Sequence, residues 1–266
     1  MNITEISCKT ALTPSKLPGL DYTLNPYIGC QHQCLYCYAP EILHMRRNDW
    51  ETTIKVKRNI PLILSKELKQ KTPGTIGIST VTDPYQPIEK TCKLTRYCLE
   101  VLQKHAFPLC IQTKSDLIIR DKDLIASIDN SEVMVSIGTL NEAHRRLLEP
   151  GSSTIQQRLS ILEAFKDTNV KTSVFFGPIY PSITVEDLPE ILDVFIAYEI
   201  DEIMIDYLHM KKTIIPVLSR FIEQQKDVPS GFSMDHLMHQ KTSFHLIRKT
   251  IHEYLKNKNV TVVDAF

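Results

Sequence analysis

Short apolar runs rich in β-branched residues alternate with longer segments of helical periodicity along most of this chain. The runs occupy residues 22–28, 75–80, 109–113, 133–137, 172–179 and 202–208. This alternation is typical of a parallel sheet whose strands are joined by crossover helices. Six right-handed units in succession curve into a closed or nearly closed barrel. The pattern therefore predicts an α/β fold, a partial (β/α)6 TIM-like barrel, with its reactive face at the carboxyl ends of the strands.

The segments between these runs carry apolar stripes at helical spacing. Leu94, Cys98, Val101 and Leu102 form one such stripe, and similar stripes lie within residues 117–128, 155–165 and 188–196. After the sixth run, two more stripes at 214–221 and 244–255 lead to an apolar run at 260–263 that could add one more strand. We therefore expect an N-terminal extension (1–20), a barrel (21–210) and a helical C-terminal extension packed on the barrel (211–266).

Charge and composition exclude several classes of protein. Lys plus Arg and Asp plus Glu both number 31, whereas proteins that bind nucleic acid by bulk charge are strongly basic. The glycines form neither GxGxxG nor GxxxxGK[ST], which argues against glycine-loop nucleotide sites. No apolar run approaches the roughly 18 residues of a membrane span, and the first residues lack the features of a signal peptide. We expect a cytoplasmic protein with no membrane partner.

Three of the seven cysteines fall within eight residues, as Cys30, Cys34 and Cys37. Thiolates select zinc, copper(I) or iron–sulfur clusters. A structural zinc site normally has four ligands, and the nearest fourth donor, His32, lies inside the triplet where reaching the same ion would be strained. A [4Fe–4S] cluster also normally takes four cysteines, so three would leave one iron open. The spacing alone leaves zinc and a cluster as alternatives.

The surrounding residues narrow this choice. A CxxxCxYC motif with Tyr36 before the last cysteine resembles the cluster motif of the radical S-adenosylmethionine (radical SAM) superfamily. Together with the stretches at 25–30, 80–89 and 111–115, it resembles the spore photoproduct lyase-related group, often labelled DNA-repair photolyases, from about Asn25 to His209. The resemblance implies a [4Fe–4S] cluster, S-adenosylmethionine bound to its open iron, and reductive cleavage that starts hydrogen abstraction from a substrate.

The resemblance also implies roles for individual residues. The cluster would be bound by Cys30, Cys34 and Cys37, and the cofactor would be bound by Tyr36, Thr82, Asp83, Lys114, Ser136, Gly177 and Pro178. Among these, Tyr36 would lie along the adenine, and Lys114 would offer its ammonium group to the cofactor carboxylate. Glu89 is a further polar candidate. The implied partners are an unidentified substrate, whether nucleic acid, peptide or small molecule, and a one-electron donor such as flavodoxin or ferredoxin.

The sequence departs from spore photoproduct lyase at one position. In that enzyme the hydrogen-donating cysteine directly precedes a Ser-Asp pair, whereas Val81 precedes the corresponding Thr82-Asp83 pair here. A valine cannot return a hydrogen atom through a thiol, so spore photoproduct lyase activity is not expected unless Cys92 or another residue substitutes. The alternative from a different class is a zinc-stabilised nucleic-acid or protein binding module without turnover.

Overall fold

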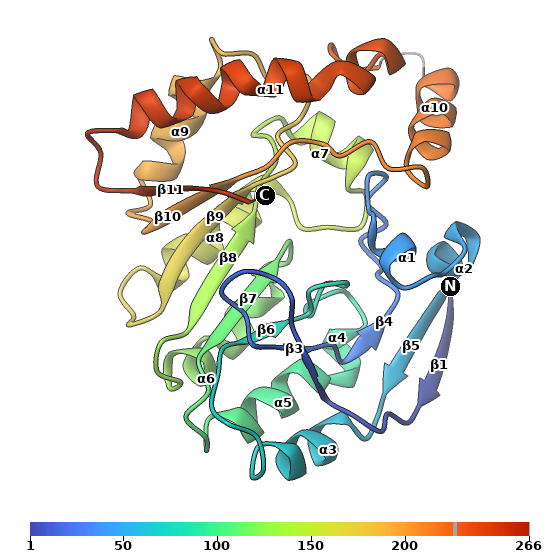
Figure 1. Ribbon diagram of the computed structural model, residues 1–266, viewed down its shortest axis with the longest axis vertical. Coiled ribbons are helices and arrows are strands. Elements are labelled where there is room, and N and C mark those ends of the chain that lie inside the picture. Colours follow the sequence, from blue (N-terminus) through green and yellow to red (C-terminus); the bar gives the residue numbers. More distant parts are fainter. Residues whose placement is uncertain (226–227, 266) are drawn as a thin grey trace.

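A computed structural model describes residues 1–225 and 228–265 of the protein. Its centre is an eight-stranded sheet in the order β11-β10-β9-β8-β7-β6-β3-β2 (Figure 1). The strands are β2 (Leu12–Pro14), β3 (Tyr22–Leu24), β6 (Ile76–Ile78), β7 (Leu109–Thr113), β8 (Glu132–Ser136), β9 (Lys171–Phe176), β10 (Glu202–Ile205) and β11 (Thr261–Asp264). Strands β3 and β6 to β10 are parallel neighbours in chain order, which confirms the six predicted units.

The sheet is an open partial barrel because its first and last strands do not pair with each other. Strand β2 is antiparallel to β3 at one edge, and β11 is parallel to β10 at the other. The central strands are buried along most of their length, as parallel strands covered on both faces must be. Strand β11 is the extra strand that was predicted at the end of the chain.

The first predicted run does not form one strand. Residues 22–24 pair with β6 as β3, whereas β4 (Tyr27–Ile28) joins a second sheet with β5 (Thr53–Lys57) and β1 (Asn2–Ile6). The interruption falls at Asn25-Pro26, and proline has no amide hydrogen to donate to a neighbouring strand. Through β1 and β2, residues 1–20 contribute a strand to each sheet. The division at residues 20 and 210 stays a prediction.

Helices connect the strands and cover the sheet. They are α1 (Ala39–Ile42), α2 (Arg47–Thr52), α3 (Ile60–Glu67), α4 (Glu89–Cys92), α5 (Leu94–Leu102), the 3-10 helix η1 (Asp116–Asp121), α6 (Lys122–Ala126), α7 (Glu142–Leu148), α8 (Ile155–Phe165), α9 (Leu188–Ile196), α10 (Ile215–Gln224) and α11 (Met234–Leu255). Helix α8 begins with a capping box between Thr154 and Gln157, which satisfies amide groups that the helix itself leaves unpaired.

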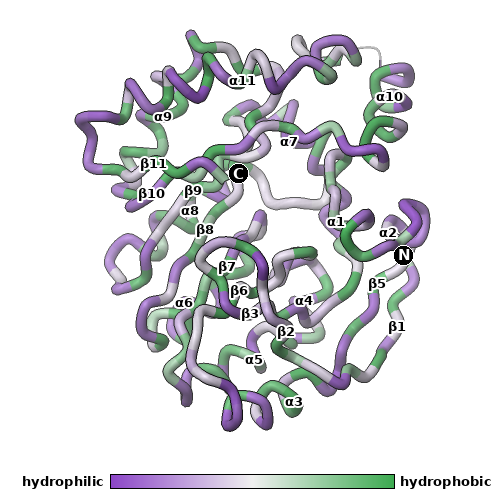
Figure 2. Tube along the Cα trace, in the orientation of Figure 1, coloured by the Kyte–Doolittle hydropathy of each residue, from purple (hydrophilic) through white to green (hydrophobic). Residues whose placement is uncertain are grey.

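The C-terminal part lies over one end of the sheet. Helix α11 packs against α9 and α10 before the chain returns as β11 (Figure 1). Hydrophobic and hydrophilic stretches alternate along α11 (Figure 2), and Leu237, Ile247, Ile251 and Leu255 are the apolar residues that it buries. Among the described residues, no helix combines the length and apolar character needed to cross a membrane.

Candidate active site

The residues expected to form the site all follow the carboxyl ends of parallel strands. The cysteine loop (residues 29–38) comes after β3 and β4, Thr82 and Asp83 follow β6, and Lys114 directly follows β7. Ser136 is the last residue of β8, and the Gly177-Pro178 pair follows β9. Because these strands are parallel neighbours, their carboxyl ends meet at one edge of the sheet. This is the edge where a barrel of this type places its chemistry.

The three cysteines of the loop are sheltered from solvent and lie near one another. Cys30 and Cys34 are each 8% exposed, and Cys37 is half-buried. Burial raises the pKa of the Cys30 thiol to about 12, and the neighbouring Asp83 and Cys37 add to that shift. Burial also raises the pKa of Cys34 and of Cys37. The neighbouring thiols of Cys37 and Cys30 raise the pKa of Cys34 further. The free thiols are therefore protonated, and a bound metal must displace their protons.

The thiols are not arranged around a single metal ion. Within residues 1–225 and 228–265, no three His, Cys, Asp or Glu side chains are close enough to share one ion. Four thiolates around one zinc would lie about 3.8 Å apart, as follows from the usual zinc–sulfur distance of about 2.3 Å. In a cubane each cysteine binds a different iron, so its thiolates are farther apart. Three neighbouring thiols, two of them buried and one half-buried, suit a cluster by the chemistry of their donors.

Backbone contacts fix the shape of the cysteine loop. The Arg47 guanidinium donates to the carbonyl oxygens of Cys34 and Cys37, each at 3.0 Å, and also pairs with Glu51 at 2.7 Å. On the other side, the Leu35 amide donates to the carbonyl of Leu148 at 2.9 Å. The loop is thereby held between α2 and the end of α7 without using the thiols.

Gly29 begins the cysteine loop in a conformation that few other residues adopt. Its φ is +91°, and a Cβ placed there would collide with the Thr53 carbonyl oxygen. Its own carbonyl accepts from the Thr82 hydroxyl at 2.6 Å and from the Gln86 amide at 3.1 Å. Close approach to β5 on one side and to the β6 loop on the other therefore requires glycine.

We expect Gly29→Ala to destabilise the protein by roughly 2–5 kcal/mol, because left-handed backbone strain adds to the collision with Thr53. Gly19→Ala is the matched control, since Gly19 also has positive φ (+74°) but nothing lies within 4 Å of the added carbon. It should lose only about 1 kcal/mol. Urea unfolding of both variants measures the difference, and equal losses would show that Gly29 is not held by close contact.

Asp83 connects three parts of the site. Its Oδ1 accepts from the Tyr85 amide and the Thr113 hydroxyl, each at 2.8 Å, and its Oδ2 accepts from the Lys114 amide at 2.8 Å. His32 Nδ1 lies 3.4 Å from the same Oδ2, and burial lowers the pKa of this histidine, so the ring is neutral. Asp83 therefore joins the ends of β6 and β7 to the cysteine loop.

Lys114 presents an ammonium group beside the cysteine loop. Its Nζ lies 5.9 Å from the centre of the Tyr36 ring, and no carboxylate of the described residues lies within 4.0 Å of it, the distance of an ion pair. Burial by itself lowers the pKa of Lys114, but Glu149 and Cys34 outweigh this effect and raise it above its ordinary value. The side chain is therefore a positive charge without a direct ionic partner.

Thr82, Ser136, Gly177 and Pro178 line the same edge. Besides holding Gly29, the Thr82 hydroxyl accepts from Gln86 at 3.0 Å. Ser136 is 1% exposed, and its hydroxyl accepts from Gln112 at 3.1 Å. The segment that follows Gly177-Pro178 returns toward β8, because the Tyr180 amide donates to the Gly138 carbonyl at 3.1 Å. Both hydroxyls already have protein partners, so they also support the loops around them.

A buried ion pair beside the cysteine loop was not anticipated from the sequence. Glu149 is fully buried and accepts hydrogen bonds from the Tyr36 hydroxyl and the Arg158 guanidinium. Burial would raise the pKa of Glu149, but Arg158 and Lys114 lower it to about 2, so the carboxylate is charged. Arg158 also donates to the Ser136 carbonyl at 2.9 Å. No sequence motif indicates this ion pair, because Glu149, Arg158 and the residues that they contact, Tyr36 and Ser136, come from four separate segments of the chain.

Other residues near the strand ends form two groups. Tyr180 lies edge-on to Tyr36 with ring centres 6.3 Å apart, and its buried hydroxyl has no hydrogen-bond partner in the structure. After β10, the His209 ring lies 2.9 Å from Asp206 and packs on Tyr207, with ring centres 4.1 Å apart. Asp206 and Cys37 both raise the pKa of Tyr38, which places the β10 group beside the cysteine loop.

Glu89 and Cys92 belong to α4, and within the described part of the chain their side chains form no hydrogen bond with the cysteine loop. The Glu89 carboxylate accepts from Tyr27, from the Thr95 amide at 3.1 Å and from Arg120 at 2.7 Å, so it holds the start of α5. Cys92 is buried at the end of α4, where Arg58 and Glu89 are among the charges acting on its thiol. Val81 instead packs with Cys30 against Trp50.

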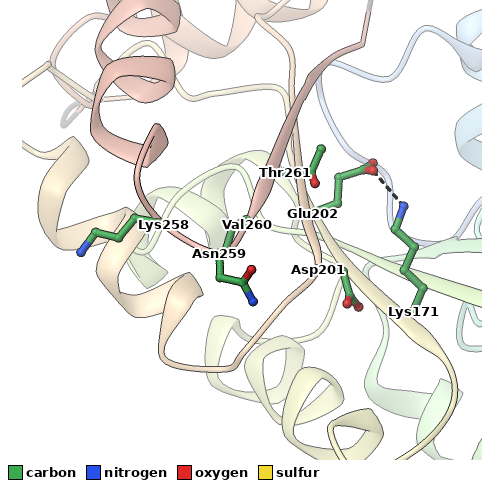
Figure 3. Close-up of a pocket in the computed structure, with 7 residues that line it drawn as sticks. All are labelled: Lys171, Asp201, Glu202, Lys258, Asn259, Val260 and Thr261. Atoms are coloured by element: carbon green, nitrogen blue, oxygen red, sulfur yellow. Dashed lines mark hydrogen bonds and ion pairs between the residues drawn. The ribbon is translucent and has the colours of Figure 1, made fainter.

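A cavity of about 470 Å³ lies at the opposite edge of the sheet (Figure 3). It is lined by the first residues of β9, β10 and β11, namely Lys171, Glu202 and Thr261, together with Asp201 and the turn before β11. Lys171 and Glu202 pair with each other at 2.8 Å across it. These are the amino ends of the strands, so the cavity is separate from the site around the cysteines.

Comparison with known proteins agrees with this architecture. The chain is 37% identical over 185 residues to the uncharacterized protein MJ0683 of Methanocaldococcus jannaschii, covering 69% of this chain and 70% of that protein. It is 33% identical to the uncharacterized protein Rv2578c of Mycobacterium tuberculosis, covering 68% of this chain but only 56% of that protein. Its fold matches spore photoproduct lyase complexed with dinucleoside spore photoproduct, with a TM-score of 0.65, 15% identity, and coverage of 98% of this chain and 81% of the lyase.

An open (β/α)6 sheet with a cysteine loop at its carboxyl edge is the architecture of a radical SAM enzyme. The family described as the radical SAM superfamily matches residues 24–195, which include every residue expected at the site. The chain belongs to the radical SAM superfamily and is an enzyme. Membership implies a [4Fe–4S] cluster and S-adenosylmethionine as cofactors, and it does not favour the zinc-stabilised binding module.

Proposed function

We propose that this enzyme binds one [4Fe–4S] cluster through Cys30, Cys34 and Cys37 and S-adenosylmethionine at the remaining iron. The observation that supports this proposal most is the triplet of neighbouring thiols, two buried and one half-buried, on a loop whose backbone is held by other residues. When bound, the cluster and S-adenosylmethionine supply reductive cleavage of the sulfonium and a radical that abstracts hydrogen from the substrate. The protein residues must orient the cofactor and exclude water.

The surrounding side chains have groups that match the cofactor. Lys114 has a cation without an ionic partner, which suits the methionine carboxylate. Tyr36, held by Glu149, offers an aromatic face for the adenine. Thr82, Asp83, Ser136, Gly177 and Pro178 complete the proposed cofactor site. The Tyr180 hydroxyl is an additional donor close to Tyr36 and Glu149.

We expect Lys114→Met to raise the KM for S-adenosylmethionine about 10–100-fold with a smaller effect on kcat, because a charge-assisted hydrogen bond contributes about 1.5–3 kcal/mol. Lys258→Met is the matched control. Lys258 also lies over a tyrosine ring, at 5.6 Å from Tyr254, but beside the cavity at the other edge. Steady-state kinetics compare the two variants. If Lys114→Met and Lys258→Met bind the cofactor equally well, Lys114 is not its carboxylate partner.

We propose a one-electron donor such as flavodoxin or ferredoxin, and the cytoplasm as the location where both partners meet. The group formed by Tyr38, Asp206, Tyr207 and His209 is the part of the site nearest to solvent beside the loop, since Tyr38 is 45% exposed. We propose that this group faces the substrate, which is a nucleic acid, a peptide or a small molecule.

Anaerobic reconstitution with iron and sulfide tests the proposed function. The protein should turn brown, bind about four irons per chain and release 5′-deoxyadenosine from S-adenosylmethionine when dithionite is added. The zinc-stabilised module would instead bind a divalent ion without visible absorbance. A colourless protein that retains zinc under these conditions would contradict the proposal.

A further inference from the structure

Glu149 is an anionic side chain in direct contact with the cysteine loop, because its carboxylate accepts a hydrogen bond from the Tyr36 hydroxyl. The residue before it, Leu148, is also in contact with this loop, because its carbonyl accepts from the Leu35 amide at 2.9 Å. Glu149 is fully buried, so little solvent screens its charge. Since a charge near a metal centre changes the free energy of adding an electron, the position of this carboxylate has an electrostatic consequence.

The carboxylate is also fixed in place. Tyr36 and Arg158 donate to its two oxygens, and its backbone carbonyl accepts from Arg145 at 2.9 Å and from Ser152 at 2.8 Å. The next residues continue the contact, because the Gly151 amide donates to the His32 carbonyl at 3.0 Å. A Cβ at Gly151 would collide with the Gln31 carbonyl oxygen. The loop that carries Glu149 is therefore closely packed on the cysteine loop.

We infer that Glu149 lowers the reduction potential of the metal centre bound by Cys34, with Tyr36 and Arg158 holding its carboxylate in position. The inference rests on the proposed function, because it requires a cluster on the cysteine loop. A buried negative charge opposes the arrival of an electron. Removing that charge therefore makes the centre easier to reduce, and this effect differs from a loss of packing.

The structure supplies a matched control in a second buried group of the same composition. Glu89 is also fully buried and also accepts from a tyrosine and an arginine, Tyr27 and Arg120. The hydrogen bonds of its carboxylate go to Tyr27, Thr95, Arg96 and Arg120, none of which belongs to the cysteine loop. Glu89→Gln and Glu149→Gln thus each remove one buried carboxylate, but only Glu149 is hydrogen-bonded to the cysteine loop.

The test is a redox titration of the reconstituted protein followed by electron paramagnetic resonance. Glu149→Gln should favour the reduced centre at least tenfold, which is 59 mV for one electron. Glu89→Gln should change the equilibrium less than twofold. Equal shifts in the two variants, or no shift in Glu149→Gln, would overturn the inference while leaving the cluster itself established. Failure of the wild-type protein to take up iron would instead overturn the proposed function.

A second variant covers the case in which Glu149→Gln does not fold. Glu149→Gln/Arg158→Met removes both charges, and replacing a buried ion pair by neutral groups is often well tolerated. The shift should keep its sign but be smaller than in the single variant, because no unpaired guanidinium remains. A potential that falls below the wild-type value would contradict the inference.

Discussion

Replacing Cys34 with alanine should reduce bound iron from about four per chain to background and abolish release of 5′-deoxyadenosine. Removing one of three ligands leaves two irons of the cube without a protein ligand, and the proposed reaction requires the intact centre. The same result is expected for Cys30→Ala and Cys37→Ala. Iron and sulfide analysis after anaerobic reconstitution measures the effect, with visible absorbance as an independent reading.

Cys8→Ala is the control for this experiment. Cys8 is half-buried and lies outside the loop, and it is anchored through its backbone, which exchanges two hydrogen bonds of 2.8 Å with the Asn59 side chain. Its replacement should leave iron content and turnover unchanged. Retention of four irons by Cys34→Ala, or loss of iron in Cys8→Ala alone, would contradict the assignment of the ligands.

Arg158→Met should lower the free energy of unfolding of the metal-free protein by about 3–5 kcal/mol. The side chains of Arg158 and Glu149 are 1% and 0% exposed, so removing the guanidinium leaves a carboxylate buried without its counter-charge. Because Arg158 also donates to the Ser136 carbonyl, the end of β8 loses a hydrogen bond as well. Urea unfolding, with the midpoint and slope fitted together, gives the measurement.

A surface pair gives the contrast. Arg248 and Asp264 form two hydrogen bonds, at 2.6 and 2.8 Å, but their side chains are 46% and 30% exposed. Arg248→Met should therefore lose less than about 1 kcal/mol. Recovery of most of the lost stability in Glu149→Gln/Arg158→Met would identify the unpaired charge as the cause. A similar loss in the Arg158 and Arg248 variants would mean that burial does not strengthen the inner pair.

The order of the strands and helices could be predicted from the sequence, because apolar residues recur at a different spacing in a strand than in a helix. The apolar runs predicted six parallel strands in chain order, and the structure contains them, with the predicted bounds at β7 and different bounds at the others. The prediction of one strand at residues 22–28 was wrong, since Asn25-Pro26 divides this run between two sheets.

The interior of the site could be predicted only in part. The cysteine spacing and the residues at the strand ends could be predicted, because each depends on a short stretch of sequence. The structure brings two of these residues, Lys114 and Tyr36, together at one edge of the sheet. Glu149 was not visible, since its partner Tyr36 is 113 residues away in the sequence. Arg158 lies within an amphipathic helix, where an arginine ordinarily faces solvent. Its burial depends on a carboxylate contributed by a different loop.

The most direct test of the central claim asks whether the protein leaves one iron open for S-adenosylmethionine. Reduced, reconstituted protein would be mixed with the cofactor labelled with ¹⁵N at the methionine amino group or ¹⁷O at the carboxylate, and studied by electron–nuclear double resonance. Direct coordination predicts hyperfine coupling between each label and the cluster, with loss of the coupling in Cys34→Ala. A fully reduced cluster that shows no coupling to either label, at saturating cofactor, would contradict the account.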